Sequence, residues 1–398
     1  MPGSADLQTL FYRKLCTSYQ HFAFPRYLNK FYLANRLSCR LQSVTETLSN
    51  HWKSYAKHKY SHSRCMFSSP QASQLFSETR GTMAKKKSGI LVDPPYSSDL
   101  ASGSDNEVVF DSCAYQIPHP RKRHKGGEDT LFISATGRVV GVFDGVGAWG
   151  ELGVDPRKYA LKLSQGAQEA TDELHLLRPI DVLKYAYKYS ADVMGSSLAC
   201  IATISGNVLE YANLGDSGIL VVRPPSMLLH RSLILQHSFN LPYQLGPKSG
   251  DLPEDAIVCN IDVEMGDIVI LGTDGLFDNL EHEVIVDIIS QQFKSDPNIH
   301  LDKLAMKISQ EAFARSQDRK GQTPFSRNAL KHGYHFPGGK PDDITLILSR
   351  ITSLKDAREQ KSIRQESAAV EAAERVQASQ FSFHKLRSLF YWKTLLKF

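Results

Sequence analysis

The stretch RVVGVFDGVG at residues 138–147 joins an apolar, β-branched run to the pair Asp144–Gly145. Runs of Val, Ile and Phe favour strands, and Asp-Gly is a common turn pair. The segment therefore predicts a buried strand with a carboxylate at its end. One such pair indicates a turn more readily than a ligand, so its meaning depends on whether similar segments recur.

Three further segments bring carboxylates to the ends of strand-like runs: GED at 127–129, LGTDG at 271–275 and PDDIT at 341–345. Burying an unpaired charge is costly, and converging carboxylates repel one another. Their convergence would require cations between them, and oxygen ligands favour hard ions such as Mg²⁺ or Mn²⁺. A glycine after the Asp also lets a backbone carbonyl approach an ion.

Around these segments the chain alternates pairs of strands with pairs of helices. The β-branched runs predict strands at Leu131–Ser134, Arg138–Phe143, Leu198–Ile204, Val208–Asn213, Ile219–Val222, Ile257–Val263, Asp267–Leu271 and Ile344–Arg350. Helices are predicted at Pro156–Thr171, Ile180–Met194, Glu281–Phe293 and Leu301–Arg315. Close strand pairs indicate hairpins, so the pattern predicts an antiparallel α+β layered domain rather than βαβ units.

Composition excludes several classes of protein. The chain has 398 residues, 41% of them hydrophobic and 22% charged, which is too apolar for a wholly disordered protein. No apolar run approaches the roughly 18–20 residues of a membrane span, which argues against a multi-span protein. The six cysteines are scattered without a CxxC pair, so neither a disulfide scaffold nor a thiolate zinc site is expected.

The net charge of +5 is unevenly distributed. Residues 1–90 carry 14 Lys and Arg against 3 Asp and Glu, whereas residues 91–351 carry 24 against 34. We divide the chain into a basic, transit-like segment (1–66), a polar linker (67–106), a folded domain (107–352), and a charged helix with a basic amphipathic tail (353–398). The tail helix is expected over Lys355–Gln380.

The two basic ends each allow two interpretations. Residues 1–66 are basic, hydroxylated and poor in acids, which is typical of an organellar transit peptide, and a disordered tail that binds acidic surfaces is the alternative. Residues 381–398 mix aromatics and Leu with Lys and Arg. They suit peripheral contact with an anionic membrane or a groove on their own domain.

Taken in order, the motifs resemble those of the metal-dependent protein phosphatases of the protein phosphatase 2C (PPM) type. The matching stretches are GED (127–129), FDGVG (143–147), GSS (195–197), NLGDSG (213–218), TDGLFDN (273–279) and KPDDIT (340–345). The resemblance implies an α+β fold with a central antiparallel β-sandwich flanked by paired helices, in four layers. FDGVG, with GVDP at 153–156 and GGKPDD at 338–343, resembles the mitochondrial branch of that family.

The resemblance also implies roles for individual residues. Asp144 would bridge two metal ions, Mg²⁺ or Mn²⁺, with the Gly145 carbonyl on one of them, and Asp274 and Asp342 would hold the other. A hydroxide bridging the two ions would attack phosphorus directly. The remaining implied ligands are Asp129 and Glu128, which would act through waters, and Asp192, as the ligand of a third ion.

Two departures from the family pattern affect catalysis. Many members have a His general acid where this chain has Val146, and a phosphate-binding Arg where it has His124. The basic run at 121–125 offers Lys122 and Arg123 as replacements. By contrast, Asp278 is interpreted as structural, because Asp278 and Glu281 have the spacing of a helix-capping box.

The sequence thus predicts a metal-dependent serine/threonine protein phosphatase acting on phosphorylated proteins, with no nucleic-acid partner. The alternative is a catalytically weak or inactive phosphatase-fold protein that binds phosphorylated partners. A phosphoesterase for a small metabolite and a binder of nucleic acid or anionic lipid are further rivals. A mitochondrial location, in the matrix, is expected, with plastid and cytoplasm as alternatives.

Overall fold

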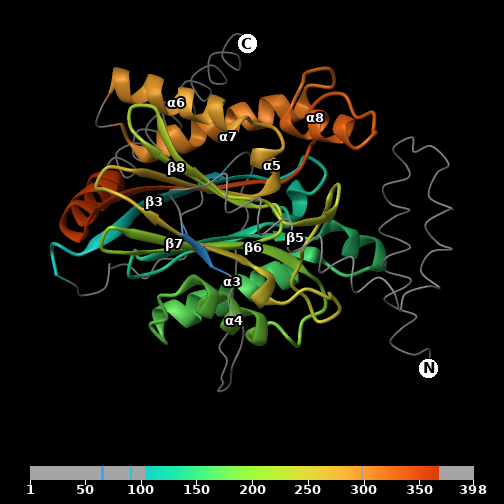
Figure 1. Cartoon of the computed structure of the whole chain (residues 1–398), viewed down its shortest axis with the longest axis horizontal. Coiled ribbons are helices and arrows are strands. Elements are labelled where there is room, and N and C mark those ends of the chain that lie inside the picture. Colours follow the sequence, from blue (N-terminus) through green and yellow to red (C-terminus); the bar gives the residue numbers. More distant parts are fainter. Residues whose placement is uncertain (1–63, 67–89, 92–103, 297–298, 367–398) are drawn as a thin grey trace, which may run out of the picture.

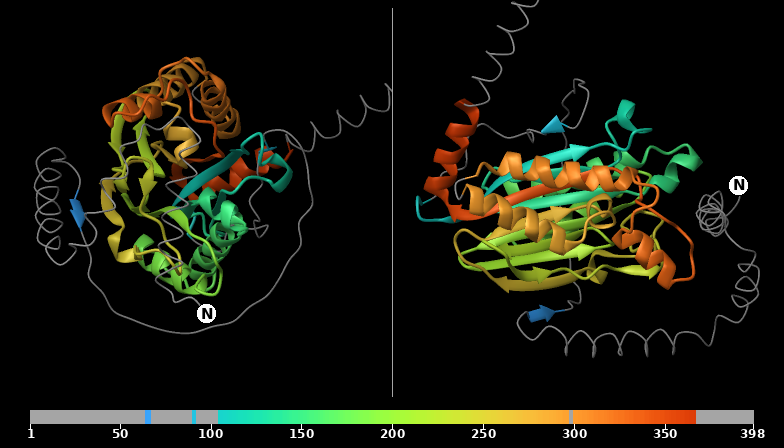
Figure 2. Two further views of the ribbon diagram at one scale, coloured as in Figure 1. Left: turned by 90° about the vertical axis from the view of Figure 1, so that its right-hand side faces the viewer. Right: turned by 90° about the horizontal axis from the view of Figure 1, so that it is seen from above.

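The computed structural model describes residues 64–66, 90–91, 104–296 and 299–366. Two six-stranded antiparallel sheets pack face to face, and each carries a pair of helices on its outer side (Figure 1). Figure 2 shows the same layers from the side and from above. The expected four-layer α-β-β-α sandwich is confirmed.

The first sheet contains the GED and FDGVG motifs. Its strand order is β1-β12-β7-β6-β5-β4. The strands are β1 (Arg64–Met66), β12 (Ile257–Asp262), β7 (Val208–Leu214), β6 (Ser197–Ser205), β5 (Val139–Gly145) and β4 (Thr130–Ile133). In β5, an interior strand next to the edge strand β4, all residues except Asp144 are buried.

The second sheet contains the TDG and PDDIT motifs. Its order is β2-β3-β14-β13-β8-β9. The strands are β2 (Ile90–Leu91), β3 (Val108–Ile117), β14 (Ile344–Ser353), β13 (Ile268–Gly272), β8 (Gly218–Arg223) and β9 (Met227–Arg231). A separate hairpin is formed by β10 (Gln236–Ser238) and β11 (Leu241–Pro242).

The helices cover the outer faces of the sheets. They are α3 (Pro156–Asp172) and α4 (Pro179–Tyr189) on the first sheet, α6 (His282–Ser295) and α7 (Leu301–Gln317) on the second, and the shorter α5 (Asp274–Phe277) and α8 (Pro324–Lys331). Short 3-10 turns are η4 (Arg123–Lys125), η5 (Gly147–Leu152) and η6 (Pro253–Asp255).

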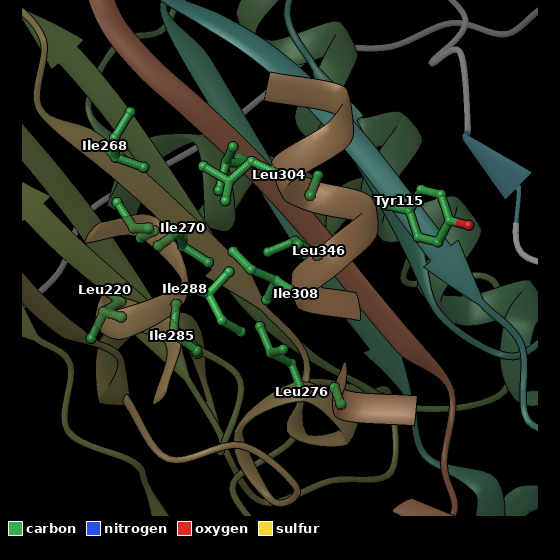
Figure 3. Packing of buried hydrophobic residues seen from close by; sticks show 14 of the residues in the cluster. Tyr115, Leu220, Ile268, Ile270, Leu276, Ile285, Ile288, Leu304, Ile308 and Leu346 are labelled. Atoms are coloured by element: carbon green, nitrogen blue, oxygen red, sulfur yellow. The ribbon is translucent and has the colours of Figure 1, made fainter. Parts of the chain in front are cut away.

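Three apolar layers hold the sandwich together. One lies between the sheets, and the other two lie between a sheet and its helix pair. Figure 3 shows the layer under α6 and α7, where Ile308 of α7 packs against Leu346 of β14. Because both faces of the central strands are buried, these strands are continuously apolar rather than alternating.

All eight expected strands and four expected helices are present, with shifted ends. Helix α4 stops at Tyr189 rather than Met194, because the chain turns at Ser190, whose hydroxyl donates to the Ala186 carbonyl. Strand β3 and helix α8 were not predicted. Among the described residues, no helix is both long and apolar enough to cross a membrane.

A helix follows β14 over residues 354–366, which confirms the expected C-terminal helix as far as the described residues extend. Leu354 and Ala357 pack against Val109 of β3. Farther along, the Arg364 guanidinium forms a bidentate ion pair with Asp111, a β3 residue that is only 4% exposed. The first turns of this helix are therefore part of the folded domain. The basic tail 381–398 and most of the transit-like segment lie outside the described residues.

Replacing Arg364 with Ala should lower the free energy of unfolding by about 3 kcal/mol, because it leaves the Asp111 carboxylate buried without its ion-pair partner. Urea unfolding of the full chain measures the change. Arg178→Ala is the matched control: Arg178 is 65% exposed in its pair with Asp181, and such surface pairs contribute about 0–1 kcal/mol. Equal losses in both variants would contradict the structural role given to the Arg364 pair.

Candidate metal centre

The four acidic segments meet at one edge of the sandwich. In the first sheet, Asp129 immediately precedes β4 and Asp144 lies near the end of the antiparallel neighbour β5. In the second sheet, Asp274 follows β13 and Asp342 precedes the antiparallel neighbour β14. Antiparallel neighbours bring one strand's end beside the other's beginning, so both sheets deliver carboxylates to the same edge. Figure 1 shows β5 and α5 on this side, below α8.

Asp144 lies at the centre of the acidic cluster. Burial raises its pKa well above the usual range, and the carboxylates of Asp129, Asp274, Asp342 and Asp216 raise it further. All four of these neighbours are acidic, so their charges and its burial both disfavour the charged form of Asp144, and a nearby cation would stabilise it.

Asp129 is fixed by hydroxyl groups of the opposite sheet. The Thr273 hydroxyl donates to Asp129 Oδ2 at 2.8 Å, and the same hydroxyl accepts the Thr345 amide at 3.1 Å. Burial raises the pKa of Asp129 well above its usual value, and Asp343 and Asp342 add to the shift. These bonds lock β4 of one sheet to β13 and β14 of the other.

Asp274 and Asp342 share the ammonium group of Lys340. Its Nζ contacts Asp274 Oδ2 and lies 3.6 Å from Asp342 Oδ2. Although burial opposes the effect, Lys340 and Lys122 lower the pKa of Asp342. Asp274 keeps a raised pKa because of burial, despite Lys340. Its second oxygen, Oδ1, is buried and has no hydrogen-bond partner among the described residues.

Glu128 and Asp343 organise the loop in front of β4. Asp343 accepts backbone N–H groups from His119 at 2.6 Å and Glu128 at 2.8 Å. Lys122 Nζ lies 2.6 Å from Glu128 Oε2, 3.7 Å from Asp342 Oδ1 and 3.6 Å from Asp343 Oδ2. A Cβ on Gly127 would lie 2.7 Å from Asp343 Oδ1, so the loop needs glycine there, where φ is +81°.

The structure separates the two basic candidates for phosphate binding. Lys122 points into the acidic cluster, whereas the Arg123 guanidinium lies 5.7 Å from the centre of the Phe313 ring on α7. Asp192 is exposed in the turn between α4 and β6. Ser197, the first residue of β6, pairs with Gly145.

The residues after Asp144 are apolar or tightly packed. A Cβ on Gly145 would lie 2.7 Å from the Glu128 carbonyl oxygen and 2.8 Å from that of Pro156, so only glycine fits. Val146 packs against Trp149 and supplies no proton.

Sequence reasoning missed Lys340, Thr273 and Asp343 as parts of this centre, although all three lie inside motifs that it singled out. The capping box expected for Asp278 and Glu281 is absent, because α6 begins after Glu281 without a side-chain cap, and Asp278 Oδ2 lies 2.9 Å from Lys340 Nζ. The sequence signal for Thr273, Lys340 and Asp343 was their position beside the pairs Asp274–Gly275 and Asp342–Asp343.

The donor set fits a hard divalent cation. Its atoms are carboxylate oxygens, Asp274 Oδ1 is buried and has no hydrogen-bond partner among the described residues, and the charged groups that shift the pKa of Asp144 most are acidic. Nowhere in the described part of the chain are three Asp, Glu, His or Cys side chains already arranged around one ion position. Instead, Lys122 and Lys340 partly neutralise the cluster.

Known proteins resemble this chain in sequence and in architecture. The protein phosphatase 2C family model matches residues 254–321. "Probable protein phosphatase 2C 55" of Arabidopsis thaliana is 40% identical over 253 residues, which cover 63% of this chain and 53% of that protein. The chain thus spans about half of that relative's length.

Two further relatives are covered more fully. "Protein phosphatase PTC7 homolog fig" of Drosophila mojavensis is 37% identical over 270 residues, covering 63% of this chain and 84% of that protein. The solved structure of the photosystem II phosphatase PBCP has a TM-score of 0.56 and 28% identity, over 62% of this chain and 100% of that one. The Drosophila protein is 37% identical and is covered over 84% of its length, and together with the matching family model it shows that the chain belongs to the protein phosphatase 2C family.

Proposed function

We propose that this protein is a metal-dependent serine/threonine protein phosphatase. The observation that carries the proposal is the acidic cluster around Asp144, in which the end of β5 meets the Asp274 and Asp342 segments of the other sheet. The family of the chain supports the same activity. Phosphorylated proteins are the proposed substrates.

Asp144, Asp274 and Asp342 would hold Mg²⁺ or Mn²⁺, two ions in all, with the Gly145 carbonyl, Asp129 and Glu128 completing the set. Bound there, the ions would neutralise charge on the phosphoryl oxygens. The remaining contributions come from the protein. Thr273 fixes Asp129, and Asp343 fixes the loop that carries Lys122 and Glu128. Asp192, exposed near Gly195, is proposed only as the ligand of a third ion.

Lys122 is the proposed phosphate-binding side chain, ahead of Arg123. Its ammonium lies at the cluster and its side chain is 29% exposed, so it can reach a phosphoryl group that enters from solvent. A lysine binds phosphate as a point charge, whereas arginine can bind it through two parallel hydrogen bonds. Because Val146 cannot donate a proton to the leaving alkoxide, turnover should be modest; a general acid typically contributes about 10²–10⁴-fold.

Replacing Lys122 with Ala should lower kcat/KM on a phosphothreonine peptide by about tenfold, since it removes a charge-assisted contact to phosphate. Steady-state phosphate release measures the effect. Lys125→Ala is the matched control, because Lys125 lies exposed on the same loop. A Lys122 variant with unchanged kcat/KM would assign phosphate binding elsewhere.

The experiment that tests the proposed function is a substrate panel for the full chain with Mn²⁺. Phosphothreonine and phosphoserine peptides should be hydrolysed faster than small phosphorylated metabolites. Binding of the phosphopeptide without hydrolysis would favour the inactive, phosphoprotein-binding alternative. Preference for a metabolite would favour a small-molecule phosphoesterase.

The proposed location is mitochondrial. The basic, hydroxylated composition of residues 1–66 supports it. A fluorescent protein fused to residues 1–66 should reach mitochondria, and a plastid or cytoplasmic signal would contradict this.

Peripheral membrane contact is proposed for residues 381–398. The full chain should bind anionic vesicles more tightly than a variant that ends at residue 380, and equal binding by the two would contradict this contact.

A further inference from the structure

Lys340 lies inside the acidic cluster rather than at its rim. Its side chain is only 15% exposed, and its Nζ contacts three carboxylates: Asp274, Asp278 at 2.9 Å and Asp342 at 3.6 Å. The ammonium also lies 5.2 Å from the centre of the Phe325 ring, on α8. A buried ammonium with three acidic neighbours has the charge and surroundings of a bound cation.

The backbone at Lys340 is held firmly against the segment that carries Asp274. The Lys340 amide donates to Asn279 Oδ1 at 2.9 Å, and Asn279 Nδ2 donates to the Lys340 carbonyl at 2.8 Å. The same Nδ2 donates to the Gly275 carbonyl at 2.9 Å, and Asn279 is fully buried. Lys340 can therefore change its partner by a side-chain rotation, while its Cα stays beside α5.

The three carboxylates differ in their expected relation to a metal. Asp274 and Asp342 belong to the proposed metal set, whereas Asp278 does not. The Oδ2 atom of Asp274 contacts the Lys340 ammonium, whereas its buried Oδ1 has no hydrogen-bond partner among the described residues. A divalent ion that binds Asp274 therefore meets the lysine ammonium at the same carboxylate, and two cations that share a carboxylate repel each other.

We propose that Lys340 is a resident cation which competes with the metal for Asp274 and Asp342, and that Asp278 receives its ammonium when the metal binds. Lys340 thus sets metal affinity: it stabilises the metal-free cluster and weakens metal binding. This inference rests on the proposed metal centre but not on the hydrolysis of any substrate.

Metal binding to the full, chelator-stripped chain tests the proposal without an activity assay. Isothermal titration with MnCl₂ gives Kd for the wild type, Lys340→Met and Asp278→Asn. Methionine keeps an unbranched chain beside Phe325 and removes the charge. We expect Lys340→Met to bind Mn²⁺ about tenfold more tightly or better, because a cationic competitor is gone. Its metal-free form should melt at a lower temperature than wild type, since the carboxylates then repel one another unopposed.

Asp278→Asn should act in the opposite direction. Without Asp278, the displaced ammonium lacks its second partner and remains on Asp274, so Mn²⁺ should bind several-fold more weakly. A purely structural role for either residue would weaken binding in both variants. Lys331→Met, at an exposed position on α8, is the control and should leave Kd unchanged.

Unchanged or weaker Mn²⁺ binding by a folded Lys340→Met variant would overturn the proposal. If that variant does not fold, equal or tighter binding by Asp278→Asn would overturn it instead. Binding by Lys340→Met but not by the wild type would support it, with the lysine fully replacing the ion. Absence of Mn²⁺ binding in every variant would reject the metal centre and this inference together, whereas Mn²⁺ binding without phosphopeptide hydrolysis would reject only the proposed function.

Discussion

An Asp144→Asn variant should lose hydrolysis of a phosphothreonine peptide by about 10³-fold or more while remaining folded. The side chain keeps its shape but loses the charge that would hold the metal, and metal ions supply several kcal/mol of transition-state stabilisation, where about 1.4 kcal/mol corresponds to tenfold in rate. Single-turnover phosphate release with saturating Mn²⁺ measures the effect. Retained activity would remove Asp144 from the centre.

The same variant should be more stable than wild type when no metal is present. Burial and the neighbouring carboxylates raise the pKa of Asp144 in the folded protein. At any pH above the pKa that Asp144 has in the unfolded chain, its charge therefore lowers the free energy of unfolding. Asparagine removes that charge. Urea midpoints in chelator should therefore be higher for the variant at pH 8, and the difference should shrink as the pH falls and wild-type Asp144 takes up its proton.

Asp262→Asn provides the control for both measurements, because Asp262 is an exposed residue of β12 outside the cluster. Its hydrolysis rate and its stability in chelator should match those of wild type. A lower stability of Asp144→Asn at pH 8 would contradict the repulsion assigned to the cluster.

A Gly275→Ala variant should lose about 3 kcal/mol or more of stability and about 100-fold in hydrolysis. A Cβ at this position would lie 2.0 Å from the Asp343 carbonyl oxygen and 3.3 Å from Ile344 Cγ1, so α5 or the Asp342–Asp343 segment must move. Overpacking commonly costs 1–3 kcal/mol, and a backbone atom gives way less easily than a side chain. A shift of about 1 Å in catalytic groups can cost roughly 10²-fold.

Thermal unfolding and steady-state kinetics, both with Mn²⁺, measure the two losses. Gly250→Ala is the matched control, because a Cβ there has no atom within 4 Å and it should behave as wild type. If Gly275→Ala kept both stability and activity, the close approach of α5 to Asp343 would be wrong.

The fold was largely predictable because its strands are buried on both faces and read as apolar runs. Strand β3 is the instructive exception. Its sequence places Asp111 in the middle of an apolar stretch, and that carboxylate is acceptable only because Arg364 pairs with it across 253 residues of chain. A pattern read along the chain cannot show a partner so distant.

The acidic site was only partly predictable. Its aspartates could be located from the sequence for a related reason. Each Asp stands at the end of its own strand, so the local sequence shows where it lies. What Lys340 and Asp343 do depends on contacts between segments. Lys340 acts on Asp274, 66 residues earlier, and Asp343 holds a loop more than 200 residues away. The capping-box prediction for Asp278 failed because α6 begins at His282, with Glu281 rather than Asp278 at its N-cap, and the Asp278 carboxylate contacts Lys340 instead.

We propose that the cluster around Asp144 is a metal centre that hydrolyses phosphoproteins, and a single titration that follows ion binding and hydrolysis together checks this claim. The chelator-stripped full chain is titrated with MnCl₂ while ion binding and phosphate release from a phosphothreonine peptide are followed on the same sample. Hydrolysis should be absent without the ion and should rise along the binding curve. Phosphate release that persists in chelator, or saturation with Mn²⁺ without any release, would contradict the claim.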